Sequence, residues 1–292
     1  MSGPRGRFLP DGQRLHLQHG PIDLIVEAFG RADEVEAAYR QAWQRFQSIL
    51  QELVDELARL RQPLTQAVPL LRGATARRML KATLPFRPRF ITPMAAVAGA
   101  VADEVMAAMT ENRHLHKAYV NNGGDIALHL TTGHALRAGV VTNQDMPALD
   151  AFTEIKHEDA VRGMATSGWR GRSLSLGIVD AVTVLAATAA AADAAATMIA
   201  NAVNAEHPAI ERMPASAVRD DSDLGDLLVT TTVGDLPRET VDRALSLGLE
   251  EAERLQATGL IDSAFLALQT QSRVTSACRN YSALPGRRST WN

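Results

Sequence analysis

The residues best suited to chemistry stand out against a segment that is mostly alanine. Between residues 188 and 204, Asp193, Thr197 and Asn201 recur at intervals of four. This spacing places them in one stripe along a helix whose other faces are apolar, and such a helix is expected to be buried. A buried carboxylate is unfavourable unless it is paired, hydrogen-bonded or bound to a cation. We therefore expect the stripe to face a polar or charged group; the alternative is a stripe that faces solvent.

A carboxylate with a hydroxyl favours one class of metal ion. Mg²⁺ is a hard cation that takes oxygen ligands, keeps several waters and shares the phosphate oxygens of a nucleotide. Zinc fits poorly, because no histidine or cysteine repeats a zinc-ligand spacing. His129 is interpreted as a pocket or core residue and His157 as part of a solvated turn, while the acidic segment 220–226 lacks the length of an EF-hand loop.

A glycine turn is the second candidate feature. Asn122, Gly123, Gly124 and Asp125 lie between two strand-like segments, and an Asn-Gly pair favours a tight hairpin because both positions accept a positive φ. Adjacent glycines also let a ligand approach the backbone closely, and Asp125 could accept hydrogen bonds from it. The alternative is a hairpin without a binding role.

A polar loop is the third candidate feature. Residues 163–173 concentrate glycines, hydroxyls and two arginines, including Thr166, Ser167, Gly168, Arg170 and Arg172. Backbone N–H groups and guanidinium groups in such a loop suit a phosphate. The loop lacks the Gly-Lys-Ser/Thr ending of a Walker nucleotide site. The alternative is a polar loop whose arginines are solvated.

Alternating strands and helices must position these features. Apolar periodicity, glycine and proline signals predict both kinds of element along the chain. Strands are expected at 15–18, 23–27, 118–121, 126–130, 135–140, 178–185, 227–233 and 265–274, and helices at 33–61, 94–109, 188–204 and 237–258. The three strands within 118–140 are expected to be antiparallel neighbours. We predict a single-core α+β protein over residues 1–292.

Residues 62–90 are the best linker candidate. They hold four prolines and a run of basic residues after an N-terminal subregion at 1–62. The segment is interpreted as a surface connection with solvated charges; the alternative is a basic rim for an anionic ligand.

Composition excludes several classes of function. A net charge of −3 without aromatic residues among the basic ones argues against nucleic-acid binding. The single cysteine, Cys278, and an N-terminus without an apolar signal segment point to the cytoplasm. The most apolar stretch is interrupted by polar residues and is mostly alanine, so a membrane span is not expected. The composition is compatible with a homodimer.

Three segments, taken in order, are similar to the ApbE family. They are Val120-Asn121-Asn122-Gly123-Gly124-Asp125-Ile126, then Ala165-Thr166-Ser167-Gly168, then Val182-Thr183-Val184 followed by Ala192-Asp193-Ala194-Ala195-Ala196-Thr197. Nearly the whole chain resembles an uncharacterised family of ApbE-like proteins, which it matches also at 91–99 and 222–225. The resemblance implies an α+β fold of the tunnelling type, with an antiparallel sheet packed with helices.

The resemblance also implies ligands and a reaction. ApbE proteins transfer FMN from FAD to a threonine of an acceptor protein, with magnesium at the pyrophosphate. Carried over by position, Asp193, Thr197 and the carbonyl of Ala165 would hold magnesium. The flavin nucleotide would be lined by Asn122, Gly123, Gly124, Asp125, Thr166, Ser167, Gly168 and Arg172, and Asp125 and Asp180 would be catalytic.

One segment departs from the ApbE pattern and leaves other functions open. ApbE transferases carry His-x-x-Asp-Pro-x-Thr-Gly before the Val-Thr-Val strand, whereas only Asp180 corresponds here. The first hypothesis is a flavin- or nucleotide-binding enzyme with Mg²⁺. The second is a different enzyme that acts on a small anionic metabolite through Arg170, Arg172 and a histidine such as His129. The third is a non-catalytic module that binds flavin or a protein partner.

Overall fold

A computed structural model describes residues 3–64, 68–140, 151–171, 173–276 and 281–283. Arg172 and Cys278 lie outside the described residues. The chain divides into two compact units, which we describe separately. The first comprises Met1–Leu136, Lys156–Ala165 and Ala186–Ala194, and the second comprises Arg137–Ile155, Thr166–Leu185 and Ala195–Asn292. The prediction of a single domain over the whole chain stays a prediction.

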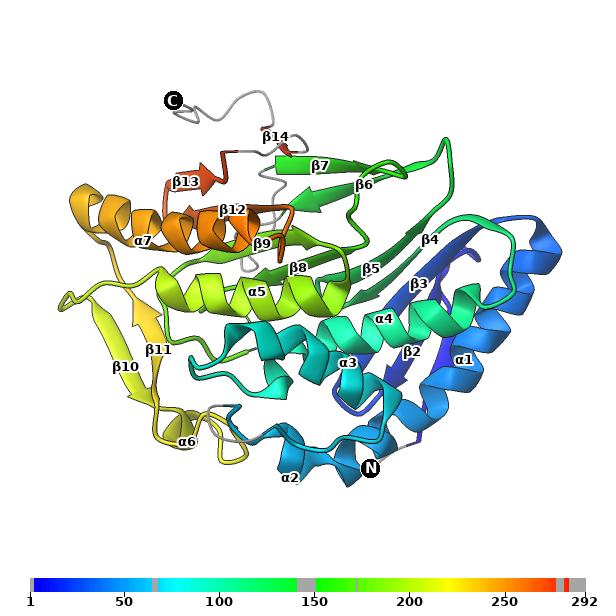
Figure 1. Ribbon diagram of the computed structural model, residues 1–292, viewed down its shortest axis with the longest axis horizontal. Coiled ribbons are helices and arrows are strands. Elements are labelled where there is room, and N and C mark those ends of the chain that lie inside the picture. Colours follow the sequence, from blue (N-terminus) through cyan, green and yellow to red (C-terminus); the bar gives the residue numbers. More distant parts are fainter. Residues whose placement is uncertain (1–2, 65–67, 141–150, 172, 277–280, 284–292) are drawn as a thin grey trace. The chain divides into compact units, whose positions relative to one another are not determined.

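The first unit is an antiparallel sheet with helices packed against it. Its elements are β1 (Arg5–Phe8), β2 (Leu15–His19), β3 (Ile22–Gly30), α1 (Ala32–Asp55), α2 (Leu57–Leu60), α3 (Ala74–Thr83), the 3-10 turns Leu84–Phe86 and Pro93–Ala96, α4 (Val97–Thr110), β4 (Leu115–Asn122) and β5 (Asp125–Leu130). Strands β1 to β5 are neighbours in that order, and β8 (Gly163–Ser167) pairs with β5 through its first residues. Helices α1 and α4 pack on these strands (Figure 1).

Local sequence explains how this unit forms. Buried and partly exposed residues alternate along β3, as expected for a strand with one face against a core. Gly20 takes a φ of 56° at the turn before β3, which glycine adopts without strain. Helix α1 buries one apolar face that includes Ala38, Phe46 and Ile49. The core of this unit therefore lies between the sheet and its helices.

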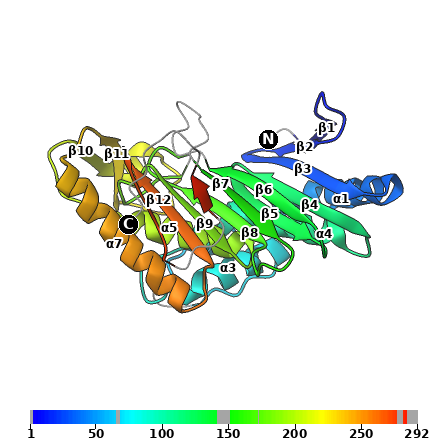
Figure 2. The same ribbon diagram turned by 90° about the horizontal axis from the view of Figure 1, so that it is seen from above.

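The second unit contains a separate set of strands and a long helix. Its elements are β7 (Ala151–Lys156), β9 (Ala181–Ala186), β10 (Ile210–Pro214), α6 (Ala215–Val218), β11 (Leu228–Val233), α7 (Arg238–Ala257), β12 (Ser263–Leu268), β13 (Gln271–Val274) and β14 (Tyr281–Ala283), with β6 (Ala135–Val140) at its start. Strand β12 pairs with both β9 and β13, and α7 packs on β12 (Figure 2). Helix α5 (Ala189–Ala202) contributes its first residues to the first unit and the rest to the second.

The α+β fold class is confirmed, and the expected elements appear close to their predicted positions. One expectation was wrong: β6 does not follow β5 in the sheet but belongs to a sheet with β7 and β14. The segment 62–90 also contains a helix, α3, which buries Met79 and Thr83. Sequence reasoning missed α3 because its apolar face is short and prolines flank it.

Within the described ranges, no helix combines the length and the apolar character that crossing a bilayer requires.

Candidate functional site

Helices α4 and α5 cap each other's first turn. Oδ2 of Asp193, on α5, accepts the N–H of Gly99 on α4 at 3.0 Å. In return, the two carboxylate oxygens of Asp103, on α4, accept the N–H groups of Ala189 and Ala190 at 3.0 and 2.9 Å. A helix leaves its first N–H groups without intrahelical partners, and its N-terminus favours a negative charge. We call these five residues, all within the first unit, the α4–α5 clasp.

The clasp depends on a very close approach of two backbones. A Cβ atom added to Gly99 would lie 2.3 Å from the carbonyl oxygen of Ala189, closer than side-chain carbon atoms approach backbone. Glycine is therefore required at this point for the two helices to touch. The alanines of α5 also allow this close approach, because Ala190 and Ala192 are buried and have small side chains.

The glycine hairpin reaches the same helix terminus. Gly123 and Gly124 have φ values of 65° and 111°, which confirms the predicted turn between β4 and β5. Oδ1 of Asn121 accepts the N–H of Gly124 at 2.8 Å, and Nδ2 of Asn122 donates to the carbonyl oxygen of Ala98 at 3.1 Å. Residues 98 and 99 thus connect the hairpin to Asp193.

The five residues of the clasp include two carboxylates and no lysine or arginine. Burial raises the pKa of Asp193 to about 7; the N–H groups of Gly99 and Ala98 oppose this rise, and the nearby Asp103 adds to it. Burial also raises the pKa of Asp103, against its two N–H donors and the positive charge of Arg78. Among the described residues, neither carboxylate forms an ion pair with a lysine or arginine. This excess of negative charge suits a cation.

The polar stripe of α5 lies at its more accessible positions. Asp193, Thr197 and Asn201 are half-buried, whereas the alanines between them are buried. Asn201 accepts the N–H of Leu176 at 3.0 Å through its side-chain oxygen. Within the described part of the chain, the Thr197 hydroxyl makes no hydrogen bond, and no three His, Cys, Asp or Glu side chains are grouped as metal ligands. A cation here would rely on oxygen ligands of mixed kind.

Asp180, in the second unit, is held by several partners. Its Oδ1 accepts hydrogen bonds from Nε1 of Trp169 and Nε of Arg170, both at 3.1 Å, and its Oδ2 accepts the N–H of Gln269 at 2.6 Å. The Arg170 guanidinium also lies 4.4 Å from the centre of the Trp169 ring. Asp180 therefore joins the 169–170 loop to the turn between β12 and β13. This structural role accounts for the aspartate without a catalytic role.

Other predicted residues of the second unit contact β9 or the residue just before it. The hydroxyls of Thr166 and Thr183 are 2.9 Å apart, and Ser167 is half-buried. A Cβ atom on Gly168 would lie 2.2 Å from the carbonyl oxygen of Asp180, so Gly168 is required by backbone packing. The polar loop thus meets β9 through small residues.

The predicted site residues fall into two groups. The first unit brings Asn122 and Asp193 to the start of α4, and it contains Asp125, which is buried. It also contains Ala165, which is buried. The second unit contains Thr166, Ser167, Gly168, Asp180 and Thr197. Their roles as flavin, metal and catalytic residues stay predictions.

Sequence reasoning missed Asp103 and the role of Gly99. Asp103 lies in an alanine-rich helix, as Asp193 does, so the same rule about a buried carboxylate could have found it. The partner of each carboxylate could not have been found, because both hydrogen bonds join residues more than 80 positions apart in the chain.

Two relatives are similar to this chain in sequence. The chain is 36% identical over 173 residues to the UPF0280 protein of Methanopyrus kandleri, covering 58% of this chain and 67% of that protein. It is also 36% identical over 142 residues to a UPF0280 protein of Methanothrix thermoacetophila, covering 48% and 55%. The chain therefore spans between half and two thirds of the length of these relatives.

Two solved structures share the fold. A mutant of the flavin transferase ApbE from Vibrio cholerae superposes with a TM-score of 0.51 at 11% identity, over 91% of this chain and 98% of that one. The ApbE protein of Thermotoga maritima gives a TM-score of 0.50 at 12% identity, over 90% and 97%. A model of the family described as "AbpE bacteria" matches residues 6–274. The chain therefore belongs to this ApbE-like family.

Proposed function

We propose that the protein binds a flavin nucleotide together with Mg²⁺ and acts as an ApbE-like transferase that moves FMN from FAD to an acceptor. The observation that carries this proposal is the pair of carboxylates in the α4–α5 clasp, which lacks a protein cation and lies beside the glycine hairpin. Perturbed carboxylates that are partly accessible are common at functional sites. The ApbE-like fold supports the same conclusion.

The residues present fit a magnesium ion. Asp193 is half-buried, and the N–H groups of Gly99 and Ala98 use two of its acceptor positions. A carboxylate offers about four acceptor positions, so room remains for a cation. Thr197 stands one helical turn away with its hydroxyl unused among the described residues. Together with the carbonyl of Ala165, these are the oxygen ligands that Mg²⁺ prefers.

The glycine hairpin fits a nucleotide. A Cβ atom on Gly124 would meet nothing within 4 Å, so the backbone is open there. Gly123 and Gly124 would let the ligand contact the main chain, while Asn122 and Asp125 would orient it. Thr166, Ser167 and Gly168, in the second unit, stay predicted nucleotide-binding residues. Bound Mg²⁺ would supply charge neutralisation at the pyrophosphate.

Asp125 and Asp180 are the two carboxylates proposed as catalytic. Asp180 accepts three hydrogen bonds, one of which, from Arg170, is also an ion pair. Asp125 is buried at the first residue of β5, next to the hairpin that would hold the ligand. Its proposed role is to hold or accept a proton at the carboxylate oxygen.

A second candidate function follows from Asp180. The missing His-x-x-Asp-Pro-x-Thr-Gly segment and the ion pair between Arg170 and Asp180 both depart from what transfer would need. The site would then take a small anionic metabolite, or would hold flavin without catalysis. Transfer of FMN to an acceptor protein is the reaction that separates these functions from the first.

The proposal is tested by titrating the purified protein with FAD, with and without Mg²⁺, while flavin fluorescence is recorded. Wild type is expected to bind FAD more tightly with Mg²⁺. Asp193→Asn is expected to weaken the Mg²⁺-dependent binding by about 10- to 100-fold, since a charge-assisted interaction contributes roughly 1.5–3 kcal/mol. Asp55→Asn, which changes an exposed carboxylate on α1, is the control. The absence of FAD binding in both conditions would end the proposal.

A further inference from the structure

Two side chains, of Thr188 and Asp103, accept N–H groups in the first turn of α5. The hydroxyl of Thr188 accepts the N–H of Ala191 at 3.1 Å, which is a local N-cap. The preceding two N–H groups, of Ala189 and Ala190, are accepted by Asp103 of α4. The first intrahelical bond then runs from the N–H of Ala192 to the carbonyl of Thr188. Every N–H of the first turn therefore has a partner, and Asp103 supplies the tertiary one.

This anchor lies close to Asp193 along the helix. Asp193 is the fifth residue of α5, so the first turn that Asp103 holds leads directly into the turn that carries its carboxylate. Gly99 limits movement from the other side, since its backbone is in contact with Ala189 and its N–H donates to Asp193. A shift of the start of α5 would move the Asp193 carboxylate away from Gly99 on α4.

We infer that Asp103 is a positioning residue, which fixes the first turn of α5 and thereby sets the affinity of Asp193 for a divalent cation. The inference rests on the proposed cation site. Metal ligands tolerate displacements of only a few tenths of an ångström, and the groups that orient a ligand change metal affinity by about 10- to 100-fold when they are removed. Asp103 orients Asp193 through the helix backbone instead of through its side chain.

A second effect of Asp103 must be separated from positioning. Its negative charge lies near Asp193 and would attract a cation by itself. Asn has one side-chain oxygen, which accepts one backbone N–H, whereas its amide nitrogen cannot accept the other, and it carries no charge. Asp103→Asn therefore keeps an acceptor for the first turn and removes the electrostatic attraction, whereas Asp103→Ala removes both.

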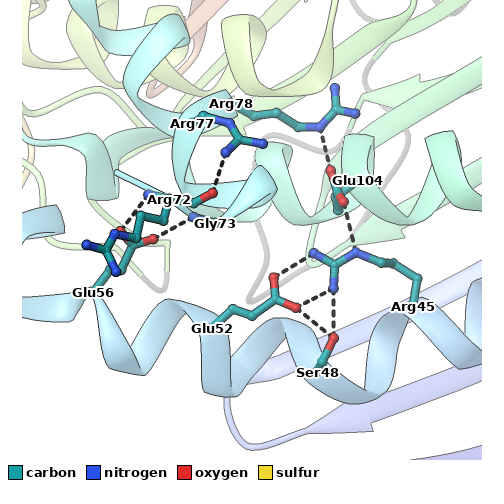
Figure 3. Close-up of polar contacts among 9 residues, drawn as sticks. All are labelled: Arg45, Ser48, Glu52, Glu56, Arg72, Gly73, Arg77, Arg78 and Glu104. Carbon is teal, nitrogen blue, oxygen red and sulfur yellow. Dashed lines mark hydrogen bonds and ion pairs between the residues drawn. The ribbon is translucent and has the colours of Figure 1, made fainter. Parts of the chain in front are cut away.

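The chain offers a matched control for the loss of a cap. Glu56 is buried, and its two carboxylate oxygens accept the N–H groups of Arg72 and Gly73 at 2.7 and 2.8 Å, before the first residue of α3 (Figure 3). It holds a helix start in the same way as Asp103, but the helix carries no candidate ligand. Glu56→Ala therefore measures what the loss of a carboxylate cap does to stability alone.

The test measures Mn²⁺ binding by electron paramagnetic resonance, with thermal unfolding recorded in the absence of metal. Asp103→Ala is expected to weaken Mn²⁺ binding by about tenfold or more. Asp103→Asn is expected to weaken Mn²⁺ binding by less than Asp103→Ala, because it retains one of the two hydrogen bonds to the first turn. Glu56→Ala is expected to lower the melting temperature about as much as Asp103→Ala and to leave Mn²⁺ affinity within about twofold.

The outcomes are distinguishable. If Asp103→Ala binds Mn²⁺ as tightly as the wild type does, the positioning role is overturned and the proposed cation site is left intact. Equal weakening in Asp103→Asn and Asp103→Ala would show that charge, not position, is what Asp103 contributes, and would also overturn the inference. Failure of the wild type to bind Mn²⁺, with or without FAD, would instead overturn the proposed cation site itself.

Discussion

Two neighbouring carboxylates on α4 face different surroundings. Glu104 points to α1 and α3, where Nε of Arg45 and Nε of Arg78 donate to it at 2.8 and 2.7 Å; Arg45 also forks onto Glu52 (Figure 3). Burial acts to raise the pKa of Glu104, but the hydrogen bonds from the two guanidiniums outweigh it and hold the pKa below its ordinary value. Glu104 is therefore a charge that the protein neutralises by itself.

Asp103 is the adjacent residue and has the opposite situation. Successive helical residues point about 100° apart, so Asp103 faces α5. There it has backbone N–H donors and a second carboxylate, Asp193. Burial raises the pKa of both, and at Asp103 it outweighs the opposing charge of Arg78, which forms no ion pair with it. The difference between Glu104 and Asp103 teaches that burial of a carboxylate alone does not identify a ligand-binding site. A buried carboxylate with its own arginines is structural, while one without a cation leaves a place for a ligand.

The largest expected effect is a difference in the free energy of unfolding between variants of Glu104 and of Asp193. Glu104→Gln should lower the free energy of unfolding by about 1.5–3 kcal/mol, because it removes the charge that both guanidiniums contact, although Arg45 keeps Glu52 and Arg78 is 39% exposed. Asp193→Asn should change it by less than about 1 kcal/mol, because Asn still accepts the N–H of Gly99 and no longer repels Asp103. Urea unfolding measures both. An equal loss in the two variants would remove the distinction between a neutralised and an unneutralised carboxylate.

A smaller effect appears as a pH dependence. The pKa of Glu104 is lowered in the folded protein from 4.5, so its contribution to stability is complete above that value and is lost as pH falls through the folded pKa. The difference in unfolding free energy between wild type and Glu104→Gln should therefore narrow as pH is lowered from about 6 to about 3. A constant difference over this range would show that the arginines do not stabilise the charged form of Glu104.

The smallest effect concerns Asp180. Its partner Arg170 has a side chain that is 35% exposed, so the ion pair is partly screened by solvent. Asp180→Asn should lower the free energy of unfolding by about 1 kcal/mol and shift the fluorescence of Trp169, and it should leave FAD affinity unchanged. If the variant is folded and binds FAD but has lost all FMN transfer, Asp180 is catalytic and the structural interpretation fails.

Local features were readable in the sequence. The glycine turn at 122–125 was predicted from residue types that accept positive φ, and the structure confirms it. The polar stripe of α5 was predicted from a four-residue spacing, and it occupies the more accessible positions of that helix. The helix α3 was missed, and β6 was assigned to the wrong sheet, because neither its neighbours nor its pairing is encoded in local periodicity.

The sequence by itself determined that Asp193 lies on an apolar helix and needs a polar partner. Only the tertiary structure decided which partner: the N–H of Gly99, 94 positions away, in a helix whose own carboxylate returns the contact. The physical reason is that spacing along a helix fixes the face on which a side chain lies, whereas the group that meets it depends on how two helices pack. That packing requires a glycine at a backbone contact too close for any other residue.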